Sequence, residues 1–199
     1  MRILIVGATG IIGQAVVAAL RPRNELILAS RTKSPEKVDL TDQSSIRALF
    51  ERVGKIDAVV SVAGEAAYKP LPQLSDQDFA FSVGSKLMGQ INLVRLGATY
   101  VNDGGSFTLT SGVLATRPTP GGAAISVVNA GVDAFARAAA LELPRGIRIN
   151  SVSPPWVSET LVAMGRDPSG GLPAADVARS YAESVEGKQT GTVITPKRR

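Results

Sequence analysis

The segment RILIVGATGIIG, residues 2–13, decides the fold, because a short apolar run leads directly into three closely spaced glycines. The run RILIV predicts a buried strand, and Gly7, Gly10 and Gly13 stand between it and a helix over residues 10–20. Gly7 permits a tight turn, Gly10 lets backbone approach a pyrophosphate, and Gly13 lets the helix pack closely on the strand. The helix N-terminus offers free N–H groups and partial positive charge to an anion. The segment therefore predicts a dinucleotide site, the alternative being a merely tight strand–helix turn.

Strand and helix patterns alternate through the rest of the chain. Further strands are expected over residues 24–30, 37–39, 55–64, 104–112, 147–154 and 190–195, and helices over residues 42–53, 75–101, 123–143 and 174–186. This alternation favours a parallel sheet with right-handed crossovers. We therefore expect one α/β domain over residues 1–199. It should hold a Rossmann-like, doubly wound and mostly parallel sheet of seven strands, with helices on both faces.

The sequence contains no Cys and no His, which excludes several kinds of chemistry. Disulfides, thiolate nucleophiles, histidine metal ligands and the usual base of a serine triad are all missing. Acid–base work must therefore fall to Lys, Tyr, Asp or Glu. A carboxylate-only Mg²⁺ site stays open, but the 17 acidic residues show no clustered arrangement, and we expect no metal.

The net charge of +5 raises the question of nucleic-acid binding. The basic residues are dispersed, and the one dense cluster, residues 197–199, is more typical of a solvated chain end than of a docking site. No nucleic-acid-binding signature accompanies it. The apolar runs are too short for a bilayer span, and no signal-peptide pattern is visible. We expect a cytoplasmic protein without a nucleic-acid or membrane partner.

The end of the second expected strand bears on which nicotinamide dinucleotide would bind. A carboxylate there would accept hydrogen bonds from a ribose 2′-hydroxyl and repel a 2′-phosphate. The sequence instead has Ser30, Arg31, Thr32 and Lys33. Arg31 can hold a phosphate bidentately, and Lys33 adds charge. These residues favour NADP(H) over NAD(H), the alternative being an exposed basic turn.

Together these motifs resemble the short-chain dehydrogenase/reductase family over nearly the whole chain. GATGIIG (7–13) resembles its cofactor loop, and VDLTD (38–42) its adenine segment. SVAG (61–64) is similar to the family's Asn-Asn-Ala-Gly turn with both asparagines lost, and TLTSG (108–112) to the strand end that carries the catalytic Ser, here Ser111. The most specific match is ELPRGIRINSVSPPWVSET (142–160), which runs into the turn beside the nicotinamide.

The resemblance implies a set of cofactor contacts and a mode of assembly. The implied cofactor contacts are Gly7, Thr9, Gly10, Ile11, Ile12, Gly13, Ser30, Arg31, Thr32, Asp39, Leu40, Ala63, Gly64, Asn129, Pro154 and Thr160. The segment between Pro155 and Ala174 would be a short substrate lid, and Trp156 could wall the nicotinamide side of the pocket. Family members usually pair through the two long helices, where Ala130, Ala134 and Ala138 would allow close approach, so we expect a homodimer or homotetramer.

The helix after Ser111 departs from the family, which carries Tyr and Lys there, four residues apart on one helix face. In the family the Lys lowers the pKa of the phenol and grips the cofactor ribose, while the phenol gives its proton to the carbonyl. Counted back from AAALEL, the Tyr position is Ile125 and the Lys position is Asn129. Loss of general acid catalysis alone costs on the order of 10²–10⁴ in rate. The usual reductase mechanism is therefore not available.

Lys86, in SKLMG, stands where the family keeps an Asn in the preceding long helix. A partly desolvated Lys there could have a lowered pKa and donate a proton. The alternative, which we favour, is that Lys86 fills the space and charge of the missing Lys or holds the cofactor. A subgroup of the family combines this SKxxGQ helix with an absent Tyr–Lys pair.

Three hypotheses about function follow from these residues, and the intact glycine loop with Arg31 argues against the third, a nucleic-acid or scaffold protein that retains the fold as a relic. In the first, the chain is an NADP(H)-dependent oxidoreductase for an unknown small carbonyl or alcohol, with Lys86 as the acid and Ser111 orienting the carbonyl. In the second, it binds NADP(H) without turnover, as a redox sensor or a partner subunit.

Overall fold

A single sheet of parallel strands forms the centre of the fold. The structure, a computed structural model, describes residues 1–198, so Arg199 of the terminal basic cluster lies outside the described residues. The strands are β1 (Arg2–Val6), β2 (Glu25–Ser30), β3 (Glu36–Lys37), β4 (Ile56–Ser61), β5 (Val101–Thr110), β6 (Arg148–Val152) and β7 (Val193–Ile194). Their order is β3-β2-β1-β4-β5-β6-β7, and every neighbouring pair is parallel. The doubly wound, seven-stranded α/β prediction is confirmed.

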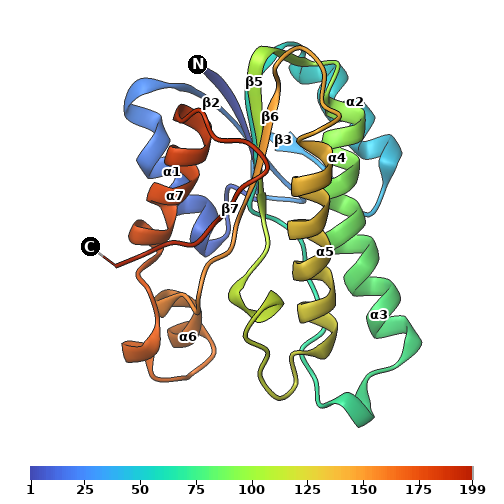
Figure 1. The fold of residues 1–199 in the computed structure, drawn as a ribbon, viewed down its shortest axis with the longest axis vertical. Helices are drawn as coiled ribbons and strands as arrows, with labels where there is room; N and C mark the ends of the chain where they lie inside the picture. The colour runs from blue at the N-terminus through green and yellow to red at the C-terminus, as the bar shows by residue number, and fades with distance from the viewer. Residues whose placement is uncertain (199) are drawn as a thin grey trace.

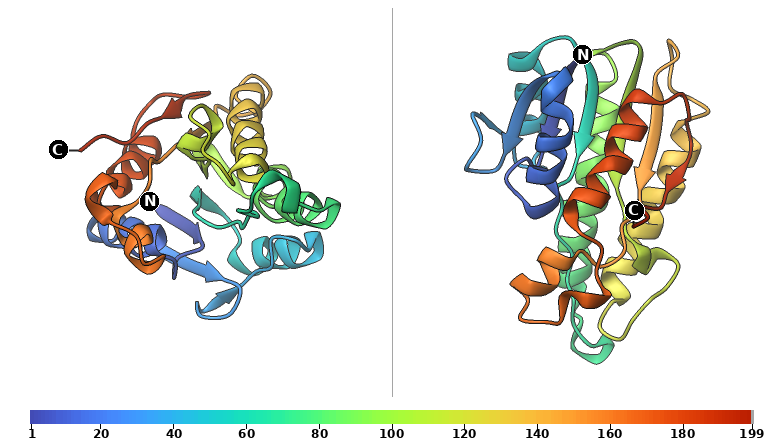
Figure 2. Two further views of the ribbon diagram at one scale, coloured as in Figure 1. Left: turned by 90° about the horizontal axis from the view of Figure 1, so that it is seen from below. Right: turned by 90° about the vertical axis from the view of Figure 1, so that its left-hand side faces the viewer.

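Helices cover both faces of this sheet (Figure 1). One face carries α1 (Ile11–Leu20) and α7 (Ala174–Glu186), which lie side by side (Figure 2). The other carries α2 (Gln43–Val53), α4 (Gly89–Gly97) and α5 (Ala123–Ala139). Short 3-10 turns occur at Arg21–Arg23, Leu71–Gln73, Val113–Ala115 and Pro168–Gly170. No helix in residues 1–198 is both long and apolar enough to cross a membrane.

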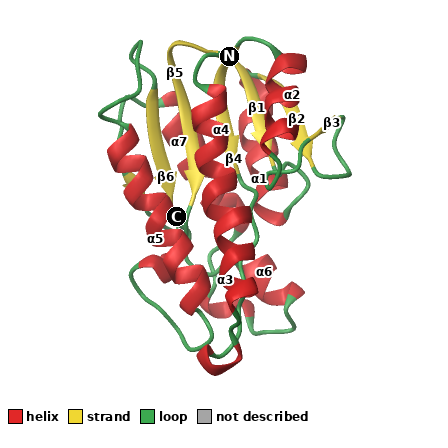
Figure 3. Cartoon of the chain, turned by 90° about the vertical axis from the view of Figure 1, so that its right-hand side faces the viewer, coloured by secondary structure: helices red, strands yellow, loops and turns green. Residues whose placement is uncertain are grey.

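Two further elements extend past the carboxyl ends of the strands (Figure 3). α3 (Asp76–Ser82) runs through a π-helical turn, η3 (Val83–Met88), directly into α4, so the three form one helical segment. α6 (Ser158–Ala163) follows β6 on the other side. Because ligands of open α/β sheets bind outside the carboxyl ends of the strands, these elements flank the expected site.

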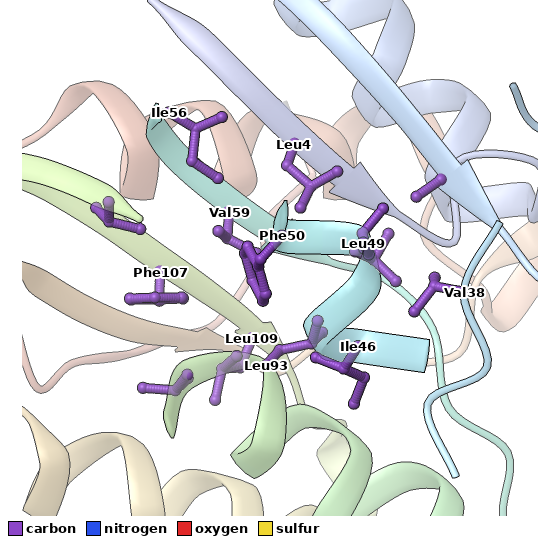
Figure 4. Packing of buried hydrophobic residues seen from close by; sticks show 14 of the residues in the cluster. Leu4, Val38, Ile46, Leu49, Phe50, Ile56, Val59, Leu93, Phe107 and Leu109 are labelled. Carbon is purple, nitrogen blue, oxygen red and sulfur yellow. The ribbon is translucent and has the colours of Figure 1, made fainter. Parts of the chain in front are cut away.

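Alternation along β1 explains why the sheet is buried on both faces. Leu4 and Val6 belong to the layer beneath α2, α4 and α5, whereas Ile3 and Ile5 belong to the layer beneath α1 and α7. Successive side chains of a strand point to opposite faces, so one strand serves both layers. Figure 4 shows the first layer, in which Phe50 of α2 lies among residues of the central strands.

Several element boundaries differ from the sequence prediction. The helix expected over residues 75–101 ends at Gly97, and β5 begins at Val101, which pairs with Ile56 of β4. The apolar residues around position 100 continue the helical pattern, but the Tyr100 N–H donates to the Gly97 carbonyl oxygen (2.9 Å) and turns the chain back to the sheet. β7 is shorter than the expected 190–195, and α6 forms within the segment expected to be the lid.

Candidate cofactor and active site

The three glycines of the first turn meet different steric demands. Gly7 has φ +90°, and a Cβ on Gly13 would lie 2.1 Å from the Gly7 carbonyl oxygen, so the fold itself requires both glycines. A Cβ on Gly10 would meet that oxygen at 3.5 Å, an ordinary contact. Within the described chain no side chain caps α1, which begins at Ile11. Gly10 therefore stands at an uncapped helix N-terminus and leaves room there, as an anion site requires.

A cavity of about 390 Å³, here called the first cavity, opens beside this turn. It gathers most of the residues predicted to meet the adenosine and phosphate part of a dinucleotide. These are Gly7, Thr9, Gly10, Ser30, Arg31, Thr32, Asp39, Leu40, Ala63 and Gly64. Two predicted residues lie outside its lining: Gly13 is buried under the turn, and Ile11 is 38% exposed at the start of α1.

Hydrogen bonds fix the loop that carries Arg31 and the carboxylate opposite it. The Ser30 hydroxyl oxygen accepts from the N–H groups of Lys33 (3.0 Å) and Ser34 (2.8 Å). Asp39 Oδ1 accepts from the hydroxyl (2.7 Å) and the N–H (2.9 Å) of Thr41, and these bonds hold the pKa of Asp39 below its usual range. Asp39 is therefore a fixed, charged acceptor in the first cavity.

Glu65 is a cavity residue that the sequence motifs did not reveal. Its Oε1 lies 2.7 Å from a guanidinium nitrogen of Arg31, and both residues line the first cavity. The two stand 34 positions apart, so only the tertiary fold brings them together. The available signal was the position of Glu65 directly after the SVAG turn, which the sheet places at the mouth of the site.

A second cavity of about 250 Å³ lies at the ends of β5 and β6 and has a largely apolar lining. It brings together the remaining predicted residues Ile12, Lys86, Ser111, Asn129, Pro154 and Thr160. Ile125 and Trp156 also line it. Gly10 lines the first cavity and Ile12 the second, so the N-terminus of α1 stands between the two.

Lys86 occupies the π-helical turn η3, and π-bulges are frequent at functional sites. Gly64, with φ +120°, allows this turn to approach β4, because a Cβ at Gly64 would lie 2.8 Å from Lys86 Cα. Burial lowers the pKa of the Lys86 ammonium to about 8, and the charge of Asp133 on α5 partly opposes that shift. Asp133 is itself buried and accepts a 2.7 Å hydrogen bond from the Ser151 hydroxyl. Burial in the second cavity thus brings the pKa of Lys86 down to about 8, where both its protonated and its neutral form are accessible.

Gln90 joins the π-helical turn to the end of β5. Its Nε2 donates to the carbonyl oxygens of Lys86 (3.1 Å) and Thr110 (2.9 Å), and its Oε1 accepts from the Thr110 N–H (2.8 Å). Gln90 is fully buried, and Thr110 immediately precedes Ser111. Its amide therefore positions Lys86 and Ser111 relative to each other. The motif SKLMGQ contained this residue, but its role required the tertiary contact.

Ile125 and Asn129 line the second cavity from α5, at the Tyr and Lys positions of the resemblance. Asn129 Oδ1 is buried and has no hydrogen-bond partner within residues 1–198. A buried acceptor without a partner costs about 1–3 kcal/mol, and a ligand hydroxyl would satisfy it. The Ser111 hydroxyl makes only a long, 3.4 Å bond to the Val152 carbonyl oxygen, which leaves it available to a ligand.

Trp156 is the one aromatic residue among residues 1–198 in the lining of the second cavity, and its indole supplies no acid. Trp156 packs edge-on against Tyr68 with ring centroids 6.0 Å apart, and the Arg166 guanidinium stands 5.2 Å from the Trp156 ring. The Tyr68 hydroxyl bonds to the Pro120 carbonyl oxygen (3.1 Å). Tyr181 is fully buried on α7, and burial raises the pKa of its phenol. In the described part of the chain, no tyrosine lines the second cavity.

Comparisons with known proteins identify the family of the chain. The family described as Enoyl-(Acyl carrier protein) reductase matches residues 13–192. The short-chain dehydrogenase/reductase ucsE of Acremonium sp is 37% identical over 103 residues, a match that covers 50% of this chain and 39% of ucsE. The chain thus spans less than half the length of that relative.

Two solved structures are similar over almost the whole chain. The protein lin1944 from Listeria innocua is 45% identical with a TM-score of 0.95, over 98% of each chain. A small-chain dehydrogenase in complex with NADPH is 26% identical with a TM-score of 0.87, over 98% of this chain and 95% of that one. The family so matched consists of oxidoreductases that bind a nicotinamide cofactor. This chain therefore belongs to the short-chain dehydrogenase/reductase family.

Proposed function

We propose that this protein binds NADP(H) across the two cavities and acts as an oxidoreductase on a small carbonyl or alcohol. In this proposal Lys86 replaces the missing Tyr as the proton donor. The observation that carries it is the placement of a buried Lys86, with a pKa of about 8, in the same cavity as Ser111. A group that titrates near the working pH suits general acid–base catalysis.

The residues present fit a nicotinamide dinucleotide. The uncapped N-terminus of α1 would hold the pyrophosphate, and the first cavity would hold the adenosine part beside Arg31 and Asp39. In the second cavity, the unpartnered Oδ1 of Asn129 would accept from a ribose hydroxyl. The preference for NADP(H) rests on Arg31 and Lys33, and one similar structure is described as a complex with NADPH.

In this proposal, different side chains of the second cavity orient the substrate and transfer its proton. When bound, the nicotinamide supplies or accepts a hydride. The Ser111 hydroxyl donates a hydrogen bond to the substrate carbonyl oxygen and orients it. The Lys86 ammonium gives that oxygen its proton during reduction, and the neutral amine removes the proton during oxidation. The apolar lining from Ile125 to Trp156 excludes water and keeps the pKa of Lys86 low.

The second candidate is an NADP(H)-binding sensor or partner subunit without turnover. Ile125 favours it, because this side chain stands at the cavity where the family places its acid and can donate no proton. In this candidate Lys86 only balances charge and holds the cofactor.

Replacement of Lys86 distinguishes the two candidates. The purified protein is titrated with NADPH and NADH by cofactor fluorescence, and cofactor consumption is then followed with small aldehydes and ketones. For an enzyme, Lys86→Met lowers turnover by about 10²–10⁴ and changes NADPH affinity little. The matched control is Lys188→Met, which removes an exposed lysine beyond α7. Equal turnover in the wild type and Lys86→Met would refute the catalytic role of Lys86. Loss of NADPH binding in Lys86→Met would show instead that Lys86 holds the cofactor.

We also propose that the protein is a homodimer or homotetramer that pairs through α5. Ala130, Ala134 and Ala138 lie on an exposed face of this helix, together with Val127. Small residues on such a face let two helices approach closely. Light scattering at micromolar concentration tests this, and a monomer would refute it.

A further inference from the structure

We infer that Glu65 competes with the cofactor 2′-phosphate for Arg31 and thereby reduces the difference in affinity between NADP(H) and NAD(H). This inference rests on the proposed cofactor binding in the first cavity. It concerns a residue that stands outside the glycine turn and outside the end of β2.

The main chain holds Glu65 opposite Arg31. The Glu65 N–H donates to the hydroxyl of Ser85 (3.0 Å), a buried residue of η3. The preceding Gly64 packs against Lys86 so closely that an added Cβ would lie 2.8 Å from Lys86 Cα. Because the backbone at residues 64–65 is fixed in this way, the Glu65 carboxylate stays within reach of Arg31, with which it pairs at 2.7 Å.

The charges around the first cavity balance. Arg31 and Lys33 contribute two positive charges, and Asp39 and Glu65 two negative charges. Asp39 is already engaged by Thr41, whereas Arg31 is the one side chain that binds the Glu65 carboxylate within residues 1–198. A phosphate monoester, with about −1.5 to −2 charge at pH 7, must displace Glu65 from Arg31 and then remain near a like charge. A free ribose 2′-hydroxyl can instead donate to a carboxylate.

The effect should be measurable but moderate. The side chains of Arg31 and Glu65 are 63% and 59% exposed, and exposed ion pairs contribute little in water. Removal of the Glu65 carboxylate frees Arg31 and also removes the repulsion between that carboxylate and the phosphate. We expect the NADPH dissociation constant of Glu65→Gln to fall about five- to tenfold. The NADH constant should stay the same or rise, and the gain should shrink as salt screens the site.

A double-mutant titration tests the inference. NADPH and NADH are titrated by cofactor fluorescence against the wild type, Glu65→Gln, Arg31→Ala and the double variant. Glu186→Gln, which breaks the Arg23–Glu186 pair at two residues that line neither cavity, is the matched control. Glu65→Gln should favour NADPH relative to NADH, and Arg31→Ala should abolish that gain. Glu65→Ala should behave like Glu65→Gln, and thermal unfolding checks that each variant is folded.

The possible outcomes separate this inference from the proposed function. If the wild type binds NADPH and Glu65→Gln leaves the NADPH-to-NADH affinity ratio within about twofold, the role of Glu65 is refuted while cofactor binding stands. If the folded wild type binds neither cofactor, the proposed function fails and the role of Glu65 fails with it. If the gain persists without Arg31, the competition for Arg31 is refuted.

Discussion

The glycine turn at residues 7–13 and the start of α5 border neighbouring cavities, yet the turn resembles the family's cofactor loop whereas α5 carries neither Tyr nor Lys. The turn keeps the glycines that the family uses, and the structure shows that Gly7 and Gly13 are also required by packing. α5 contains no Tyr or Lys, and it presents Ile125 and Asn129 to the second cavity, at the positions where the sequence comparison predicts the family's acid and its Lys. The backbone turn that we propose for cofactor binding is therefore tied to the stability of the fold. Proton transfer depends on a few side chains, which can change while the fold stays the same.

The largest expected effect is on the turn. Gly13→Ala would place a Cβ 2.1 Å from the Gly7 carbonyl oxygen, so backbone must move. We expect a loss of about 3 kcal/mol in the free energy of unfolding, roughly 6–12 °C in Tm, together with loss of NADPH binding. Gly84→Ala is the matched control, because a Cβ added there would meet no atom within 4 Å beyond its own helix backbone. Thermal unfolding measures both, and a Gly13→Ala protein as stable as the control would disprove the steric argument.

The next effect is at Gln90, which joins the π-helical turn to the end of β5. Gln90→Met would leave the N–H and carbonyl of Thr110 and the carbonyl of Lys86 without their side-chain partner in the core. The expected cost is about 2–3 kcal/mol, measured by denaturant unfolding. Turnover should fall as well, because Lys86 and Ser111 lose their common support. The exposed Gln77→Met is the control, and a cost below about 0.5 kcal/mol for Gln90→Met would show that the three bonds do not hold the site.

The next effect is on the pH dependence of stability, and it comes from the lowered pKa of Lys86. The unfolded Lys keeps its proton to its ordinary pKa of 10.5, whereas the folded one loses it near 8. The unfolded state therefore binds more protons between these values, and stability rises with pH across that window. Lys86→Met removes a penalty on the order of 1–3 kcal/mol that is fully present below pH 8. The Tm difference between Lys86→Met and the wild type should thus be largest near pH 7 and close towards pH 10.5.

A Tm difference that stays constant over this pH range would contradict the lowered pKa of Lys86. Lys188→Met serves as the control again, because it removes an exposed lysine outside both cavities.

The smallest effect concerns Asp133, whose negative charge stabilises the Lys86 ammonium. Asp133→Asn should lower the pKa of Lys86 further. The alkaline limb of kcat/KM for carbonyl reduction, which needs protonated Lys86, should then shift by about one pH unit to lower pH. Ser151→Ala removes the hydrogen bond to Asp133 and keeps the charge, so its profile should stay in place. An unshifted limb in Asp133→Asn would mean that Lys86 is not the titrating acid.

The sequence alone predicts the features that depend on local residue patterns. The glycine spacing, the alternation of strands and helices, and the absence of Tyr and Lys from residues 123–139 were all visible in the sequence. The π-helical turn at Lys86 was not, because one extra residue in a helical turn hardly changes the apolar periodicity. Arg31 and Glu65 stand 34 positions apart, and Gln90 and Thr110 stand 20 apart. These contacts form only when the strands and helices assemble, so local sequence patterns do not predict them.

The most direct measurement is a titration of the wild type with NADPH by cofactor fluorescence, beside Gly10→Ala. A Cβ at Gly10 makes only an ordinary 3.5 Å contact within the protein, so this variant should fold normally while the side chain intrudes on the pyrophosphate site. Saturable binding by the wild type, strongly weakened in a stably folded Gly10→Ala, is the predicted result. If the folded wild type shows no saturable binding of NADPH, the central claim that the glycine turn forms a working cofactor site is contradicted.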